Sequence, residues 1–232
     1  MPEITLNILD GQDYRTNESY KSLRTNIEFS GKENKVLLLT SCTPNEGKST
    51  VAVSLAASLA ESGKKVLLID ADLRKSVLYG RYHIHQEIMG LSHFLSGQCT
   101  IAEALCKTNV KGMYVIFAGP VPPNPAELLG GGRFAALIEE ARKAYDYVVV
   151  DTPPLGSVID SAVVAKNSDA AVIVIAAKTV SYNYARVVKN QMEKSGCKIL
   201  GVVLNKVDMK QNKYYGKYYG KYYGNYGKSG EK

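Results

Sequence analysis

The chain alternates short, nearly continuous apolar segments with longer segments in which apolar residues recur every three or four positions. Continuous apolar segments are typical of strands covered on both faces, and the longer spacing is typical of amphipathic helices. The alternation predicts an α/β fold with a doubly wound, mostly parallel sheet. The predicted strands are residues 35–41, 65–69, 113–118, 147–150, 170–176 and 199–204. The predicted helices are residues 18–29, 49–61, 133–144, 160–166 and 184–194.

The positive charge of the chain is concentrated at its C-terminal end. The 232 residues carry a formal net charge of +7, of which residues 210–232, with six lysines and one glutamate, supply +5. The body of the chain is therefore nearly neutral, which argues against a nucleic-acid-binding domain. We expect no nucleic-acid partner.

Three features of the sequence predict an intracellular protein. The N-terminus has no basic segment followed by an apolar run. The longest apolar stretch, residues 170–177, is much shorter than the ~18 residues that a membrane-spanning helix needs. The four cysteines form no Cys-x-x-Cys pair, which favours free thiols over disulfides or a metal site. We therefore expect a cytoplasmic protein without a membrane anchor of its own.

A phosphate-binding loop is predicted at residues 42–50, which read Cys-Thr-Pro-Asn-Glu-Gly-Lys-Ser-Thr. It lies between a predicted strand and a predicted helix, where successive backbone N–H groups and the helix dipole favour a polyphosphate. Gly47 permits close approach of the backbone, Lys48 supplies a charge near the β/γ-phosphates, and Ser49 offers a hydroxyl to Mg²⁺. Cys42 stands where the motif has its first glycine. The predicted nucleotide-binding residues of the loop are Pro44, Asn45, Glu46, Gly47, Lys48, Ser49 and Thr50.

Three aspartates follow two of the predicted strands. Asp70 and Asp72 lie in Leu-Leu-Ile-Asp-Ala-Asp-Leu-Arg at 67–74, and Asp151 lies in Val-Val-Val-Asp-Thr-Pro-Pro at 148–154. One carboxylate here can orient Mg²⁺, directly or through water, and another can accept a proton from an attacking hydroxyl. A lone aspartate at a strand end is usually a turn or cap residue, but three of them behind a phosphate loop favour a phosphoryl-transfer site.

The segment Asn-Lys-Val-Asp at 205–208 follows the last predicted strand and allows two interpretations. It matches the Asn-Lys-x-Asp sequence with which GTPases read guanine. However, the acidic segment is Asp-Thr-Pro-Pro rather than Asp-x-x-Gly, and no further folded element follows. These differences favour a contact between Asn205 and adenine.

The C-terminal segment 213–228 repeats Tyr-Tyr-Gly-Lys with a period of four and contains no aliphatic side chain. Such a segment cannot build a core, so residues 210–232 are expected to be disordered. Tyrosines interleaved with lysines can bind single-stranded nucleic acid by stacking, or they can be phosphorylated. Composition leaves both possibilities open, and the phosphate-binding body favours phosphorylation. The candidate acceptors are Tyr214, Tyr215, Tyr218, Tyr219, Tyr222, Tyr223 and Tyr226.

The phosphate loop and the segments 67–74 and 148–154 together resemble the bacterial tyrosine kinases of capsule and exopolysaccharide operons. Those kinases belong to the P-loop family that includes the MinD/ParA ATPases. Residues 17–29, residues 118–129 and the tyrosine cluster strengthen the resemblance, which covers roughly residues 14–228. It implies a kinase domain at 1–209, with an oligomerisation helix at 14–30, and a tyrosine-cluster tail at 210–232.

The resemblance also implies an ATP-dependent protein-tyrosine kinase that autophosphorylates this tail with Mg²⁺ as cofactor. Lys48 would stabilise the transferring phosphoryl group. Asp70 would accept the tyrosine proton, with Asp72 as the second candidate. The metal ligands would be Ser49, Asp72 and Asp151.

Glu18, Lys21 and Arg24 recur every third residue along one helix edge. Spacing alone favours a solvated edge with weak ion pairs within the helix. The resemblance implies instead that this edge joins subunits into a ring. Lys21 stands where the family usually has arginine, which would replace a bidentate contact by a point charge and weaken the ring.

The resemblance implies partners beyond the chain itself. These are other tyrosine-containing protein substrates and a separate membrane adaptor that activates the kinase and recruits it to the inner face of the cell membrane. The process would be polysaccharide chain-length control and export. Two other classes remain open: a MinD/ParA-like ATPase switch whose tail binds a partner, and a nucleic-acid-binding NTPase that uses the tail.

Overall fold

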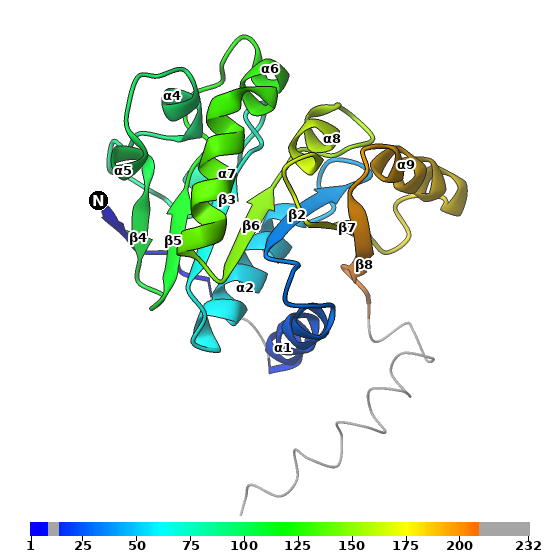
Figure 1. The fold of residues 1–232 in the computed structure, drawn as a ribbon. Helices are drawn as coiled ribbons and strands as arrows, with labels where there is room; N and C mark the ends of the chain where they lie inside the picture. Colours follow the sequence, from blue (N-terminus) through cyan, green and yellow to red (C-terminus); the bar gives the residue numbers. More distant parts are fainter. Residues whose placement is uncertain (9–13, 209–232) are drawn as a thin grey trace, which may run out of the picture.

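The computed structural model describes residues 1–8 and 14–208, so the tyrosine cluster lies outside the described residues. The described residues contain an eight-stranded sheet in the order β1-β4-β5-β3-β6-β2-β7-β8 (Figure 1). Neighbouring strands are parallel except for β4 and β5. The strands are β1 (Glu3–Ile4), β2 (Val36–Ser41), β3 (Val66–Asp70), β4 (Cys106–Thr108), β5 (Met113–Ile116), β6 (Tyr147–Asp151), β7 (Ala170–Ala176) and β8 (Lys198–Asn205). The helices are α1 (Tyr14–Phe29), α2 (Lys48–Glu61), α3 (Leu78–Arg81), α4 (Leu91–Leu95), α5 (Ile101–Ala104), α6 (Pro125–Gly130), α7 (Gly132–Ala144), α8 (Asp160–Ala165) and α9 (Tyr182–Lys194).

Two hydrophobic cores lie on opposite faces of the sheet, because successive strand residues point to opposite sides. In β2, Val36 and Leu38 belong to one core, while Leu37 and Leu39 belong to the other. Helices α4 to α9 contribute to the first core, and α1, α2 and α3 contribute to the second. Figure 1 shows α7 across one face of the sheet and α2 across the other. This layering explains why the central strands are apolar along nearly their whole length.

The doubly wound, mostly parallel fold predicted from the sequence is confirmed. All six predicted strands are present, with ends that differ by no more than two residues, and all five predicted helices are present. The sequence did not predict β1, β4 or the helices α3 to α6, because two to six residues are too few to show a periodic pattern. Within the described ranges, no helix combines the length and the apolar character needed to cross a membrane.

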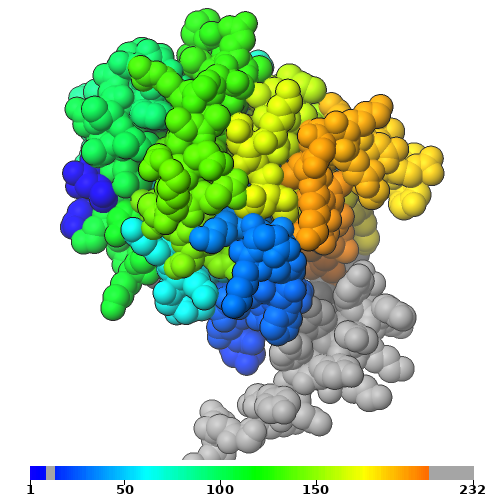
Figure 2. Space-filling model, viewed as in Figure 1, coloured from blue at the N-terminus to red at the C-terminus, as the bar shows by residue number. Residues whose placement is uncertain are grey.

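Helix α1 lies at the surface of the body and packs on α2 (Figure 2). Arg24 Nη1 donates to the carbonyl oxygen of Ser58, near the end of α2, at 2.8 Å. Lys21 instead pairs with Glu18 at 2.8 Å, with 52% of the Lys21 side chain exposed. Of the three residues predicted to join subunits, Arg24 therefore braces α1 against its own domain, while Glu18 and Lys21 lie at the surface. Their contact with another subunit stays a prediction.

Candidate nucleotide and phosphoryl-transfer site

The functional candidates gather at the carboxyl ends of the neighbouring strands β3, β6, β2, β7 and β8. In a parallel sheet these ends lie along one edge, which is where α/β proteins bind ligands. Asp70 ends β3, Asp151 ends β6 and Asn205 ends β8, while the phosphate loop follows β2. The structure thus brings the predicted site residues of the body to one edge of the sheet.

The phosphate loop passes from β2 into α2 through two residues with a left-handed backbone. Gly47, the N-cap of α2, has a φ of 86°, and Asn45 has a φ of 65°. A Cβ at Gly47 would lie 2.3 Å from Asn205 Nδ2, so a side chain there would also displace Asn205. The glycine predicted to allow close approach therefore also makes room for the side chain of Asn205.

The first turn of α2 presents backbone donors. The N–H of Val51 bonds to the carbonyl oxygen of Gly47 at 3.0 Å and begins the helical ladder. The N–H groups of Lys48, Ser49 and Thr50 precede that ladder, as the first N–H groups of every helix do. These donors and the positive end of the helix dipole make a site for a phosphate anion.

The side chain of Glu46 supports the loop from inside the protein. Glu46 is 1% exposed. Its Oε2 accepts from the Thr43 N–H at 2.7 Å, and its Oε1 accepts from the Ala176 N–H and the Thr179 hydroxyl, both at 3.3 Å. The carboxylate therefore ties the loop to the end of β7. Any contact of Glu46 with a nucleotide would come from its backbone.

Two side chains at the end of β8 donate hydrogen bonds to backbone carbonyl groups of the phosphate loop. Asn205 Nδ2 donates to the carbonyl oxygen of Glu46 at 2.9 Å, and Lys206 Nζ donates to that of Asn45 at 2.6 Å. Lys206 itself has a φ of 54°, in the left-handed region. The sequence singled out Asn205 but not Lys206, although the Asn-Lys-x-Asp segment contained the signal.

Cys42, at the position of the missing glycine, is completely buried. Burial raises the pKa of its thiol to about 11, so the side chain is neutral near pH 7. The hydroxyl of Ser41 donates to the carbonyl oxygen of Thr43 at 2.9 Å and closes the chain around Cys42. The loop therefore connects β2 to α2 although position 42 is a cysteine and not the first glycine of the motif.

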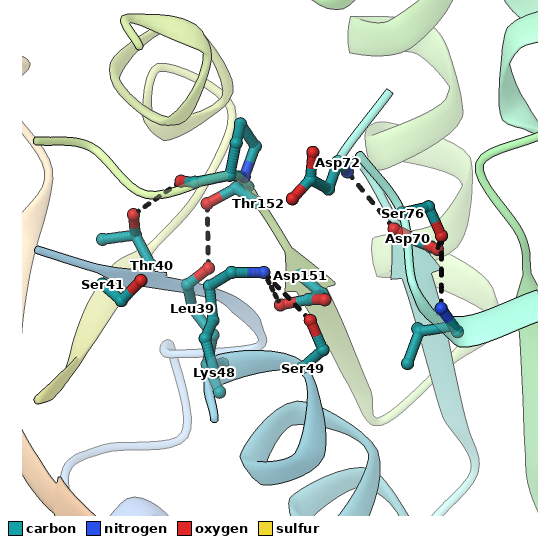
Figure 3. Close-up of polar contacts among 12 residues, drawn as sticks. Leu39, Thr40, Ser41, Lys48, Ser49, Asp70, Asp72, Ser76, Asp151 and Thr152 are labelled. Carbon is teal, nitrogen blue, oxygen red and sulfur yellow. Dashed lines mark hydrogen bonds and ion pairs between the residues drawn. The ribbon is translucent and has the colours of Figure 1, made fainter. Parts of the chain in front are cut away.

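Lys48 lies at the centre of the site, paired with Asp151 (Figure 3). Its Nζ is 2.5 Å from Asp151 Oδ1 and donates to Ser49 Oγ at 3.2 Å. Lys48 is 6% exposed and Asp151 is 1% exposed, so each charge depends on the other in a region of low dielectric constant. Asp151 Oδ2 is buried without a hydrogen-bond partner among the described residues. This oxygen is an unused acceptor beside the phosphate loop.

Asp70 is fully buried next to Asp151, its register partner on the adjacent strand. Burial, together with the charge of Asp151, raises the pKa of Asp70 to about 7. The hydroxyl of Ser76 donates to Asp70 Oδ2, and the Asp72 N–H donates to Asp70 Oδ1 at 3.3 Å (Figure 3). Asp70 is therefore a carboxyl group that can take up a proton near neutral pH.

Asp72 lies closer to the surface than Asp70 does. Asp72 is 8% exposed and Asp70 is 0% exposed. The Lys75 N–H donates to Asp72 Oδ1 at 3.0 Å. Burial raises the pKa of Asp72, and the nearby Lys48 opposes that shift.

The oxygen donors of the site fit a magnesium ion that arrives with phosphate. Mg²⁺ usually keeps several waters and needs only about one or two protein carboxylates. Asp151 Oδ2, buried and without a partner among the described residues, is the observation that supports the fit, with Ser49 and Asp72 as further oxygen donors. Within residues 1–8 and 14–208, no group of three or more His, Cys, Asp or Glu side chains could hold a metal ion. The site therefore suits a cation that is shared with a nucleotide.

Sequence reasoning missed two contacts that order the loop after β3. Arg74 makes a bidentate ion pair with the fully buried Asp160 at the start of α8, at 2.7 and 2.9 Å. Ser76, which caps Asp70, also accepts from the Leu78 N–H at 3.3 Å. Arg74 ends the segment 67–74 that contains Asp70 and Asp72, but no sequence pattern links it to Asp160.

This combination of phosphate loop, buried lysine and strand-end carboxylates defines a P-loop nucleotide-binding protein. Residues 45–199 match the family model described as an AAA domain. The structure of the septum site-determining protein MinD from Pyrococcus horikoshii, complexed with Mg-ADP, has the same fold. It gives a TM-score of 0.63 at 23% identity and covers 73% of this chain and 69% of that chain.

Closer relatives specify the class further. The tyrosine-protein kinase CpsD of Streptococcus agalactiae is 47% identical over 197 residues, which are 85% of this chain and 86% of CpsD. The kinase domain of the Escherichia coli tyrosine kinase ETK gives a TM-score of 0.78 at 36% identity and covers 82% of this chain and 75% of that chain. The chain belongs to the family of bacterial tyrosine-protein kinases. The kinase class predicted from the sequence is thus confirmed.

Proposed function

We propose that the chain transfers the γ-phosphoryl group of ATP to tyrosines of its own C-terminal cluster, from one subunit to another. The observation that carries the proposal is the meeting of Lys48, Asp70 and Asp151 beside the phosphate loop. The tyrosine-kinase family supports tyrosine as the acceptor. The proposed acceptors are Tyr214, Tyr215, Tyr218, Tyr219, Tyr222, Tyr223 and Tyr226.

Phosphoryl transfer depends mostly on positioning and electrostatic stabilisation. The backbone donors at the start of α2 bind the phosphates, and Lys48 stabilises the charge of the transferring group. Burial against Asp151 pre-positions the Lys48 ammonium group at the phosphate loop. Ser49, Asp72 and Asp151 are the proposed ligands of Mg²⁺, which would supply neutralisation of phosphate charge when bound with the nucleotide.

Asp70 is the proposed acceptor of the tyrosine proton. A general base works best when its pKa lies near the working pH, and burial raises the pKa of Asp70 to about 7. Asp70 is 0% exposed and bonded to Ser76, so a tyrosine can reach it only after a local rearrangement of the residues that cover it. Asp72 is the second candidate and lies nearer the surface.

Asn205 is the proposed contact with the adenine base. Its Nδ2 is engaged by the Glu46 carbonyl, so a contact with the amino group of adenine would use Oδ1 as the acceptor. The same side chain then connects the base with the loop that holds the phosphates. A preference for guanosine over adenosine nucleotides in a competition assay would contradict this assignment.

The proposal also covers how the subunits assemble and where in the cell the chain acts. The exposed Lys21 and the half-buried Glu18 on α1 are the proposed subunit contact, with Arg24 holding α1 in place. Family membership supports a homo-oligomer, a separate membrane adaptor that recruits the chain from the cytoplasm to the inner face of the cell membrane, and other tyrosine-containing protein substrates. The proposed process is the regulation of capsule or exopolysaccharide synthesis and export.

A mixing experiment tests both the activity and its direction. One chain carries Lys48→Met and an intact tail, and the other carries an intact site and phenylalanine at every tail tyrosine. After incubation of the mixture with Mg·ATP, mass spectrometry should find phosphate on the tail of the Lys48→Met chain. If the wild-type chain hydrolyses ATP but forms no phosphotyrosine, the protein is an ATPase switch. If the wild-type chain is phosphorylated but the mixture is not, transfer occurs within a subunit.

A further inference from the structure

An arginine that the sequence did not single out contacts the phosphate loop from α3. Arg81 Nη1 donates to the hydroxyl of Thr50 at 2.6 Å. Thr50 lies in the first turn of α2, next to Ser49, and its N–H is one of the donors that precede the helical ladder. The guanidinium group is therefore fixed beside the predicted phosphate-binding N–H groups.

The charge of Arg81 is not compensated by a carboxylate. Arg74, on the same connection, pairs with Asp160, whereas Arg81 forms no ion pair within residues 1–8 and 14–208. Arg81 is also exposed, and a guanidinium group has five N–H donors, of which Nη1 supplies the one bonded to Thr50. A guanidinium group has the geometry and the charge for bidentate contact with phosphate oxygens.

The position of Arg81 is fixed by the site itself. The hydroxyl of Ser76 bonds to Asp70 and accepts from the Leu78 N–H, and Leu78 is 1% exposed in the core. The backbone N–H of Arg81 donates to the carbonyl oxygen of Val77 at 2.9 Å. The short helix is thus held at its start by the proposed base and at its end by the phosphate loop. Less conformational freedom is lost when a group held in this way binds a ligand.

We propose that Arg81 is a further nucleotide-binding residue, which contacts the phosphate chain of the nucleotide beside Thr50. The contact adds a further protein cation to the phosphate-binding site and acts on ADP as well as ATP. Arg81 lies at Thr50, whereas Lys206 is bonded to Asn45 near the start of the loop. This inference rests on the proposed nucleotide site and goes beyond it, since the residues assigned there come from the phosphate loop and the strand ends.

The test compares the affinity for Mg·ADP of the full chain and of Arg81→Ala. Loss of a hydrogen bond between charged groups should weaken binding at least ~10-fold. Arg81→Lys should bind Mg·ADP with an affinity between those of wild type and Arg81→Ala, because an ammonium group keeps the charge but cannot make a bidentate contact. Arg186→Ala removes the same charge from an exposed position on α9 and should bind like wild type. Equal affinities of Arg81→Ala and wild type would overturn the proposal.

A merely structural role of Arg81 has a different signature. If Arg81 only pins α3 to α2, Arg81→Ala lowers the melting temperature of the nucleotide-free chain, but Mg·ADP raises the melting temperature of Arg81→Ala as much as that of wild type. That pattern overturns the proposal. Under the proposal, Arg81→Ala loses most of the melting-temperature rise that Mg·ADP gives. Failure of the wild-type chain to bind Mg·ADP would instead refute the nucleotide site itself.

Discussion

Asp70 and Asp151 lie side by side as register partners at the ends of β3 and β6. Asp151 faces the ammonium group of Lys48, whereas Asp70 faces the neutral hydroxyl of Ser76. The two carboxyl groups therefore differ in environment although they are neighbours: one is ion-paired, and burial raises the pKa of the other to about 7. Such a difference suits one group to charge stabilisation and the other to proton transfer.

The first prediction concerns the role of Asp70. Asp70→Asn should lower phosphotyrosine formation at least ~10²-fold, because an amide cannot accept the tyrosine proton. Its affinity for Mg·ADP should stay within about twofold of wild type, because a base acts on the acceptor and not on the nucleotide. Quantitative phosphotyrosine detection and calorimetric titration measure the two quantities. Loss of nucleotide binding would place Asp70 in the metal site instead.

The second prediction concerns stability and pH. Burial raises the pKa of Asp70 from 3.8 to about 7, so the folded state favours the protonated carboxyl group. The resulting destabilisation is absent below pH 3.8, grows as the pH rises towards 7, and is fully present above 7. Asp70→Asn should therefore raise the melting temperature more at pH 8 than at pH 5. The same change at both pH values would show that the pKa of Asp70 is not raised.

The third prediction concerns the central ion pair. Lys48→Met removes the charge beside the phosphate loop and Asp151→Asn weakens the proposed metal site, so each should lower phosphotyrosine formation at least ~10²-fold. Removing one partner also leaves the other buried without its counter-charge, so each single variant should be less stable than wild type. Thermal unfolding measures this effect. The double variant should regain part of the lost stability, and its failure to do so would argue against direct coupling.

The fourth prediction concerns α1. Exchanging the two charges, as Glu18→Lys with Lys21→Glu, preserves net charge and the ion pair within the helix. If this edge joins subunits, the exchanged chain should remain a folded monomer that binds ATP, and its tail phosphorylation should fall. Light scattering measures the mass. The matched control exchanges Glu140 and Lys143, which form an equivalent exposed pair on α7. Equal masses for the α1 exchange and wild type would exclude the edge.

The fifth prediction concerns the tail. Residues 210–232 carry +5, and each phosphate adds about −1.5 to −2 at pH 7, so three or four phosphates reverse the sign. A tail bound near Asp70, Asp72 and Asp151 would then be repelled, and the proposed homo-oligomer should loosen. Light scattering before and after autophosphorylation, with the all-phenylalanine tail as control, measures the change. A phosphorylated protein that stays as assembled as the control would refute electrostatic release.

The parts of the site that the sequence predicted all have a local signal. Gly47, Lys48 and Ser49 are adjacent in a known loop, and Asp70 and Asp151 each follow a buried apolar segment. Parallel strands then bring these segments to one edge of the sheet, so the strand pattern alone implies their proximity.

The parts that the sequence did not predict depend on distant contacts. Arg74 and Asp160 are separated by 86 positions, and Arg81 and Thr50 by 31. Hydrogen bonds of this kind leave no periodic pattern. The antiparallel strand β4 was missed for a related reason, since three residues gain their strand structure from pairing with β1 and β5 rather than from their own composition.

Lys206 is bonded to the phosphate loop. The number of residues between Lys206 and a tyrosine therefore limits how far that tyrosine can lie from the loop. Tyr214 follows Lys206 by eight positions and Tyr226 follows it by twenty. At up to ~3.6 Å per residue, the first can lie no more than about 29 Å from Lys206, and the second no more than about 72 Å. The proposed acceptor tyrosines therefore differ in how far they can lie from the subunit's own site. This maximum distance is shortest for Tyr214 and longest for Tyr226, which has the length to reach the site of another subunit in the proposed assembly.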